Sequence, residues 1–174
     1  MKASTRNLTA CAMMVAILAV LAQIAIPLPF SPVPLTLQTA GIILAGLILG
    51  SKKGALTVLV YIILGAVGAP VFAAGRAGLG VVAGPTGGFF AGFILAVLLI
   101  DWLLKKNRSL LRSYIAVALA TLLILVCGVI YYSIWAKISF WASFIAVGLP
   151  FLPGDLIKLL LFTPLGLAVK KALP

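Results

Sequence analysis

The chain has 174 residues, of which 64% are hydrophobic and only 9% are charged. A soluble domain carries about 45–50% apolar and about 25% charged residues, so this composition excludes a soluble globular fold. The apolar runs are nearly continuous and lack the two-residue alternation of a membrane β-barrel. We therefore predict an all-α membrane protein that forms one integral membrane domain over residues 1–174.

The formal net charge is +11, which in a soluble protein would suggest nucleic-acid binding. Most of the cations, however, fall in short clusters between apolar segments, which is the pattern of membrane-topology signals. We predict a lipid bilayer as the surroundings and no nucleic-acid partner. Cys11 and Cys127 lie inside apolar runs, and the chain has no His, so neither a disulfide nor a metal site is indicated.

The first predicted membrane helix runs from about Leu8 to Ile26 and is interpreted as a retained helix, not a cleaved signal peptide. It carries small residues at Ala12, Ala16 and Ala19. Small residues at this spacing let two membrane helices approach closely. The spacing alone leaves two interpretations open, docking to another protein and packing within the same subunit.

Two irregular segments interrupt the apolar pattern. Four prolines between residues 27 and 34 exclude a helix, and an apolar non-helical segment must lie against protein, so we predict a plug or lid. Helices are predicted at about 35–50 and 54–68, joined by a basic turn at 51–53. The glycine-rich residues 69–88 then form a connection too long for a simple turn, which favours a functional loop.

Further helices are predicted at about 89–104, 114–132 and 153–169. Residues 133–149 contain tryptophans and are predicted to form an interfacial helix. With six membrane spans, ten of the thirteen Lys and Arg residues fall on one side. The positive-inside rule then places both termini in the cytoplasm and the two irregular segments outside.

The last predicted helix begins with an ionisable pair. Asp155 is one of only two acidic residues, and Lys158 lies on the same helical face one turn later. Charged residues in a membrane helix are costly and are typical of ligand sites, where a carboxylate accepts N–H groups and an ammonium attracts an anion. The alternative is a structural ion pair. The other acidic residue, Asp101, is expected to pair with Lys105.

Five other side chains are candidates for a ligand site because they lie near the irregular segments or could face them: Gln38, Tyr61, Phe72, Arg76 and Thr86. Gln38, Tyr61, Phe72 and Thr86 could supply hydrogen bonds or stacking walls, and each could equally serve ordinary packing. The alternative for Arg76 is a solvated loop cation. The chain contains no Gly-x-x-x-x-Gly-Lys-Ser/Thr motif and no nucleophile–base set. We therefore predict a binding protein that is neither an enzyme nor an ATPase.

At this point the sequence resembles the BioY family, the biotin-specific substrate-binding (S) components of energy-coupling factor (ECF) transporters. Four motifs carry the resemblance in chain order: VPLTLQT at 33–39, GAPVFA at 68–73, GPTGGF at 84–89 and LPGDLIK at 152–158. The resemblance implies a six-helix S-component bundle in a prokaryotic cell membrane. It also implies high-affinity capture of biotin from outside, with delivery by a transmembrane coupling subunit (T component) and a pair of ABC ATPases, and no cofactor.

The resemblance also suggests roles for the candidate residues. Asp155 would accept the ureido N–H groups of biotin, and the carboxylate of biotin would pair with Lys158 or Arg76. Phe72 or Tyr61 would form apolar walls, and the alanine stripe of the first helix would meet the coupling subunit. Two alternatives remain: an S component for another vitamin, and a membrane scaffold without a small ligand.

Overall fold

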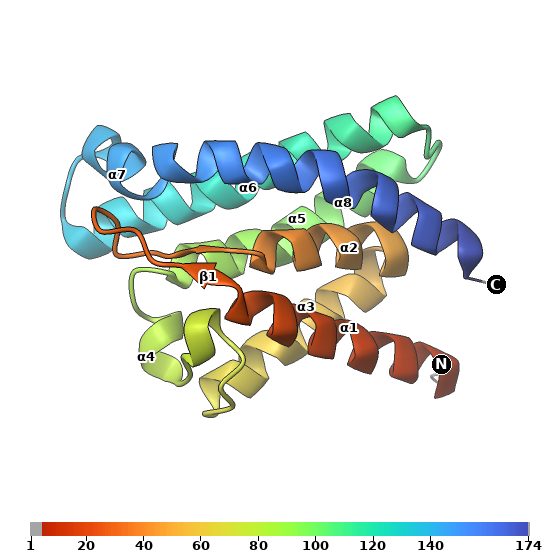
Figure 1. The fold of residues 1–174 in the computed structure, drawn as a ribbon, viewed down its shortest axis with the longest axis horizontal. Coiled ribbons are helices and arrows are strands. Elements are labelled where there is room, and N and C mark those ends of the chain that lie inside the picture. The colour runs from red at the N-terminus through yellow and green to blue at the C-terminus, as the bar shows by residue number, and fades with distance from the viewer. Residues whose placement is uncertain (1–4, 174) are drawn as a thin grey trace.

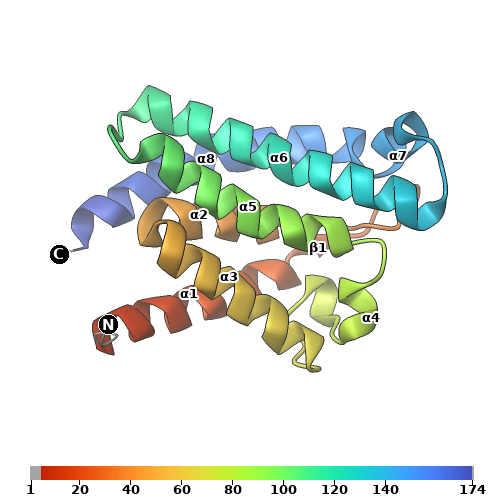
Figure 2. The ribbon, with the colours of Figure 1, turned by 180° about the vertical axis from the view of Figure 1, so that it is seen from behind.

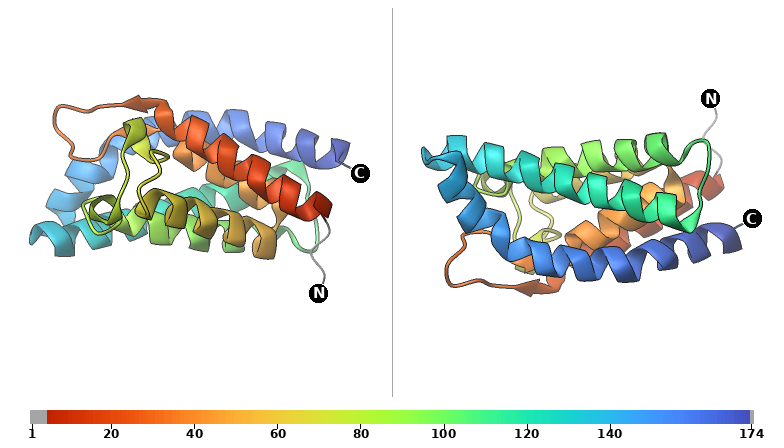
Figure 3. Two further views of the ribbon diagram at one scale, coloured as in Figure 1. Left: turned by 90° about the horizontal axis from the view of Figure 1, so that it is seen from below. Right: turned by 90° about the horizontal axis from the view of Figure 1, so that it is seen from above.

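The computed structural model describes residues 5–173, and most of them form long helices that lie side by side (Figure 1). The longer helices are α1 (Thr5–Gln23), α2 (Gln38–Leu49), α3 (Ser51–Ala66), α5 (Gly87–Leu104), α6 (Leu110–Ala136) and α8 (Leu152–Ala172). Both ends of the chain and the α5–α6 connection lie at one end of the bundle, and α4 (Leu79–Val82) and α7 (Phe140–Val147) lie at the other (Figures 1 and 3).

The proline segment is non-helical, as predicted, and it is closed by a short sheet. Strands β1 (Ala25–Ile26) and β2 (Leu35–Thr36) pair antiparallel on either side of it. The glycine-rich segment contains the short helices η1 (Ala73–Gly75) and α4, and η2 (Leu149–Phe151) joins α7 to α8. Both irregular segments lie at the end of the bundle opposite the termini (Figure 1).

Helix α2 is enclosed by the other helices, because every residue from 38 to 48 is buried. Its 12 residues measure about 18 Å, well short of the ~30 Å hydrocarbon core of a bilayer. An enclosed helix tolerates irregular backbone at its ends because protein, not lipid, surrounds it. The central position of α2 therefore permits its short length.

Four helical segments of the described chain are long and apolar enough to cross a membrane: α1, α5, α6 and the continuous α7–α8 segment Phe140–Ala172. The structure therefore supports a helical membrane bundle, whereas six crossings remain a prediction. Helix α3 has only 16 residues, and α2 is shorter still.

Some predicted boundaries were wrong for local reasons. The first helix ends at Gln23 because Ile26 pairs with Leu35 in the sheet. The predicted turn at 51–53 belongs to α3, and the chain reverses at Gly50 (φ 79°), where a side chain would be strained. Helix α6 is longer than predicted, from Leu110 to Ala136.

Helices α5 and α6 lie side by side (Figure 2), and small residues allow them to pack closely. Gly88, Gly92 and Ala96 repeat every four residues and are buried on one face of α5. A Cβ at Gly92 would lie 2.9 Å from the Cα of Ile124 in α6. Small residues stabilise membrane helix pairs by permitting such backbone contact.

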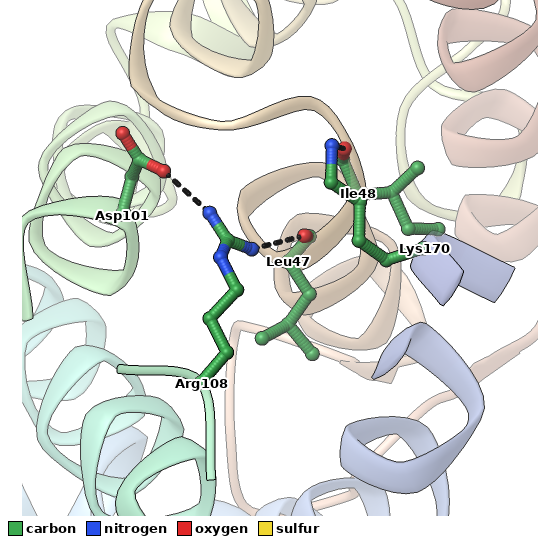
Figure 4. A network of polar contacts seen from close by, with 5 residues as sticks. All are labelled: Leu47, Ile48, Asp101, Arg108 and Lys170. Atoms are coloured by element: carbon green, nitrogen blue, oxygen red, sulfur yellow. Dashed lines mark hydrogen bonds and ion pairs between the residues drawn. The ribbon is translucent and has the colours of Figure 1, made fainter. Parts of the chain in front are cut away.

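The last turn of α2 is held by one cation from the α5–α6 connection and one from α8 (Figure 4). The guanidinium of Arg108 donates from Nη1 to the carbonyl of Leu47 at 2.9 Å and from Nη2 to Asp101 at 2.9 Å. Lys170 donates to the carbonyl of Ile48 at 2.7 Å. Asp101 thus pairs with Arg108 and not with Lys105 as predicted, because Arg108 reaches the carboxylate and a helix C-terminus together.

Candidate substrate-binding site

A small cavity lies between the proline segment and helices α2, α5, α6 and α8. Its polar lining comes from Thr36, Gln38, Thr39, Asp155 and Lys158. Its apolar lining is formed by Val33, Pro34, Phe89, Phe93, Ile124, Leu125 and Phe151. A few polar groups within mainly apolar and aromatic walls are typical of a small-molecule site.

Asp155 and Lys158 form an ion pair on the cavity wall. The ammonium of Lys158 donates to Oδ1 of Asp155 at 2.8 Å, and the side chains are only 4% and 12% exposed, respectively. An ammonium has three N–H donors, and within residues 5–173 this bond uses only one of them. A buried charge with unused donors is costly unless another group satisfies them, which favours a ligand over a purely structural pair.

The ion pair lies at the N-terminal end of α8. It is nevertheless closer to the middle of the bundle than a position at a helix end would suggest. Asp155 is in the first turn of α8, yet the cavity that it lines also includes Ile124 and Leu125 from the middle of α6. Helix α8 therefore begins beside the middle of α6, and α7 with η2 continues the chain outward. The site is consequently enclosed within the bundle and covered by the proline segment.

Gln38 lies on the cavity wall, and Tyr61 lies behind it. The Nε2 group of Gln38 donates to the hydroxyl of Tyr61 at 2.6 Å, and this hydroxyl donates to the carbonyl of Val71 at 2.9 Å. The hydroxyl of Thr36 donates to Oε1 of Gln38 at 3.1 Å. This chain of bonds links strand β2, the cavity wall and the glycine-rich segment.

Phe72 is fully buried in the layer behind the cavity. Its ring packs against Tyr61, with centroids 5.6 Å apart, and against Phe90, with centroids 4.7 Å apart. Gly65 allows this position, because a Cβ there would overlap the Phe72 ring. The structure thus places Tyr61 and Phe72 as supports of the site and not on its surface.

The remaining two predicted site residues lie in the glycine-rich segment, away from the cavity lining. The hydroxyl of Thr86 donates to the carbonyl of Val81 at 2.8 Å, which closes that segment just before α5. Arg76 has an exposed side chain and follows η1, where Ala74 adopts a left-handed conformation (φ 54°). Arg76 would reach the cavity only if this segment moved.

Sequence reasoning missed the aromatic walls formed by Phe89, Phe93 and Phe151. The rings of Phe89 and Phe151 lie 5.9 Å apart, and all three line the cavity. Phe89 ends the GPTGGF motif, and Phe151 directly precedes the motif that contains Asp155. Proximity to these motifs was the available signal, because hydrophobicity does not distinguish one apolar residue from another in such a chain.

Two of the three alanines in the stripe of α1, Ala12 and Ala16, face away from the bundle, whereas Ala19 packs against the core. Ala12 and Ala16 are exposed and Ala19 is half-buried, whereas Met14, Leu18 and Ala22 form the buried face. Ala12 and Ala16 therefore do not pack within the subunit. Of the two interpretations left open by the spacing, docking to another molecule agrees with this placement.

A helical membrane bundle around a lidded, largely apolar cavity with one buried ion pair defines a substrate-binding membrane protein. The whole sequence, residues 1–174, matches the profile described as the BioY family. The chain belongs to the BioY family, whose members are transporter components and not enzymes.

Related proteins are similar to this chain over nearly their full length. A protein of Rhizobium etli named biotin transporter BioY is 34% identical, covering 98% of this chain and 96% of the relative. A protein of Thermotoga maritima with the same name is 39% identical, covering 95% and 96%. A crystal structure described as the S-component for biotin from an ECF-type ABC transporter matches with a TM-score of 0.89 and 32% identity, covering 95% and 91%.

Proposed function

We propose that this protein captures biotin as the S component of an ECF-type importer, as one integral unit of a prokaryotic cell membrane. The observation that carries the proposal is the buried Asp155–Lys158 pair in a cavity with aromatic walls. The names of the relatives and the similar S-component structure support biotin as the substrate. The end of the bundle with both termini carries most of the cations, and we assign it to the cytoplasm.

The geometry of the ion pair constrains how biotin binds. The ureido ring of biotin offers N–H donors and a carbonyl acceptor side by side, and the ion pair offers an acceptor and donors side by side. The carboxylate is at the opposite end of biotin. Because Asp155 and Lys158 are 2.8 Å apart, an extended biotin cannot place one end on each of them. We assign the ureido ring to the pair and the carboxylate to Arg76, with closure of the glycine-rich segment.

Calorimetry of biotin binding to the purified protein tests the site. Asp155→Asn and Lys158→Ala should each weaken binding by at least about thirtyfold, because truncating one partner of a buried charge pair costs about 2–5 kcal/mol. Lys137→Ala is the matched control, since Lys137 is an exposed cation that does not line the cavity. Failure of the wild-type protein to bind biotin would refute the proposal and favour another vitamin or a scaffold. Unchanged affinity in both variants would place the site elsewhere.

Biotinamide, which lacks the charge of the carboxylate, tests the assignment of the two ends. Arg76→Ala should weaken binding of biotin but have little effect on binding of biotinamide, whereas Lys158→Ala should weaken both. If the effect of Lys158→Ala disappears with biotinamide instead, the carboxylate binds to Lys158 and the ureido ring binds elsewhere in the cavity.

Import also requires partners that supply energy. The chain has no nucleotide-binding motif of the Gly-x-x-x-x-Gly-Lys-Ser/Thr type, and the similar crystal structure is described as part of an ECF-type ABC transporter. We therefore propose a transmembrane coupling subunit and a pair of ABC ATPases as partners. The outward-facing Ala12 and Ala16 support α1 as the surface that meets the coupling subunit.

A further inference from the structure

A second cavity, a groove of about 1020 Å³ including its open side, lies on the outer surface of the bundle and is separate from the substrate cavity. It is formed mainly by α5, with Leu123 of α6 on one side and Ser51 of α3 at one end. The position of Ser51 follows from the reversal at Gly50, where a Cβ would lie 3.1 Å from Oδ1 of Asp101 in α5. The groove therefore reaches the end of the bundle that holds both termini.

The character of the groove changes along one face of α5. Leu95, Leu98, Trp102 and Lys105 follow one another at helical spacing and all line the groove. The two leucines are 45% and 39% exposed, and Trp102 is 70% exposed. In membrane proteins this order, from aliphatic residues through tryptophan to lysine, follows the passage from hydrocarbon to headgroups.

We propose that this groove binds a phospholipid with an anionic headgroup. One acyl chain lies along Leu95, Leu98 and Leu123, the glycerol region lies at Trp102, and the phosphate pairs with the ammonium of Lys105. Basic pockets between membrane helices on the cytoplasmic side are known to bind such headgroups. The proposal does not depend on the identity of the transported substrate.

The other charged residue that lines the groove, Asp101, does not repel an anionic headgroup. Asp101 also lines the groove, but its carboxylate bonds to the guanidinium of Arg108 at 2.9 Å and points toward it (Figure 4). The negative charge is therefore compensated within the protein, and Lys105 contributes the local positive charge. Lys106, the next residue, is also exposed but does not line the groove, so it provides a matched control.

Quenching of Trp102 fluorescence by brominated lipids tests the proposal. Trp135 and Trp141 are exposed and lie on α6 and α7, so Trp135→Phe and Trp141→Phe leave Trp102 as the single tryptophan. This protein is reconstituted into vesicles that mix unlabelled phosphatidylcholine with either dibromo-phosphatidylglycerol or dibromo-phosphatidylcholine. Phosphatidylglycerol should quench Trp102 with an apparent affinity about fivefold higher than phosphatidylcholine, as expected for one lysine at the surface.

Two further variants separate a defined site from general attraction to a basic surface. Lys105→Ala should abolish the preference for phosphatidylglycerol, whereas Lys106→Ala should retain it. Equal quenching by both lipids in the parent protein would overturn the proposal, because the groove would then hold only bulk lipid. Equal loss of preference in both variants would also overturn it, because the attraction would then belong to the whole basic surface.

Discussion

Tyr61 supports the candidate site without lining it. Its hydroxyl accepts from Gln38 and donates to Val71, so it holds a side chain of the cavity wall against the glycine-rich segment. Phe72 packs edge-to-face on the same ring. Because Tyr61, Gln38 and Phe72 are buried and Tyr61 does not line the cavity, a change at Tyr61 acts on the cavity through Gln38.

Tyr61→Phe should keep the ring packing and remove both hydrogen bonds. A buried amide donor left without its partner costs about 1–3 kcal/mol, and the freed Gln38 can turn within the cavity. We expect lower thermal stability and weaker biotin binding, measured by thermal unfolding and calorimetry. Tyr132→Phe is the control, because the ring of Tyr132 stacks on Trp135 and lies outside the cavity lining. Normal affinity in Tyr61→Phe would show that Gln38 is held by other contacts.

At the scale of elements, enclosed helix α2 depends on its neighbours at both ends. Its first residue, Gln38, bonds to α3, and its last carbonyls accept from Arg108 and Lys170. Cations at a helix C-terminus are favourable because they compensate the partial negative charge of unpaired carbonyls. The cations that indicated topology in the sequence thus also hold the central helix in place.

Arg108→Lys should destabilise the protein although it keeps the charge. The planar guanidinium bonds to Leu47 and Asp101 at once, whereas an ammonium is a point donor on a different stem. We expect a loss of about 1–3 kcal/mol, as for hydrogen bonds to charged groups, measured by denaturant unfolding in detergent. Lys106→Arg, at an exposed position, should leave stability unchanged. Equal stability of both variants would show that the bond to Leu47 contributes little.

At the scale of the whole molecule, α1 presents two faces with different roles. Met14, Leu18 and Ala22 pack into the bundle, and Ala12 and Ala16 face outward. An outward face of small residues permits close approach of another helix, which lipid alone does not require.

Ala16→Leu should therefore reduce biotin uptake in cells that contain the coupling subunit and the ATPases, while biotin affinity of the purified protein stays the same. The larger side chain separates the two helix surfaces, but position 16 is not part of the cavity lining. Ile17→Leu is the control, because Ile17 is exposed on α1 but lies on a different face of the helix from Ala12 and Ala16. If Ala16→Leu weakened biotin binding by the purified protein, and reduced uptake only to that extent, Ala16 would instead support the fold of the subunit.

Much of the candidate site was predictable because polar residues stand out in an apolar sequence. Asp155, Lys158 and Gln38 were selected on that basis, and all three line one cavity. Thr36 and Thr39 were adjacent to Gln38 in the same motif but were not selected. Phe89, Phe93 and Phe151 could not be selected because no local pattern marks which apolar side chains face the cavity.

The sequence by itself determined a helical membrane protein, the non-helical proline segment, the ion pair and the family. Composition, proline geometry and helical spacing are local properties, so the sequence alone reveals them. Only the tertiary structure decided that α2 is enclosed, that Phe72 lies behind the cavity and that Ala12 and Ala16 face outward. The physical reason is that lipid and protein core are equally apolar, so hydrophobicity alone does not show which face of a membrane helix meets its neighbours.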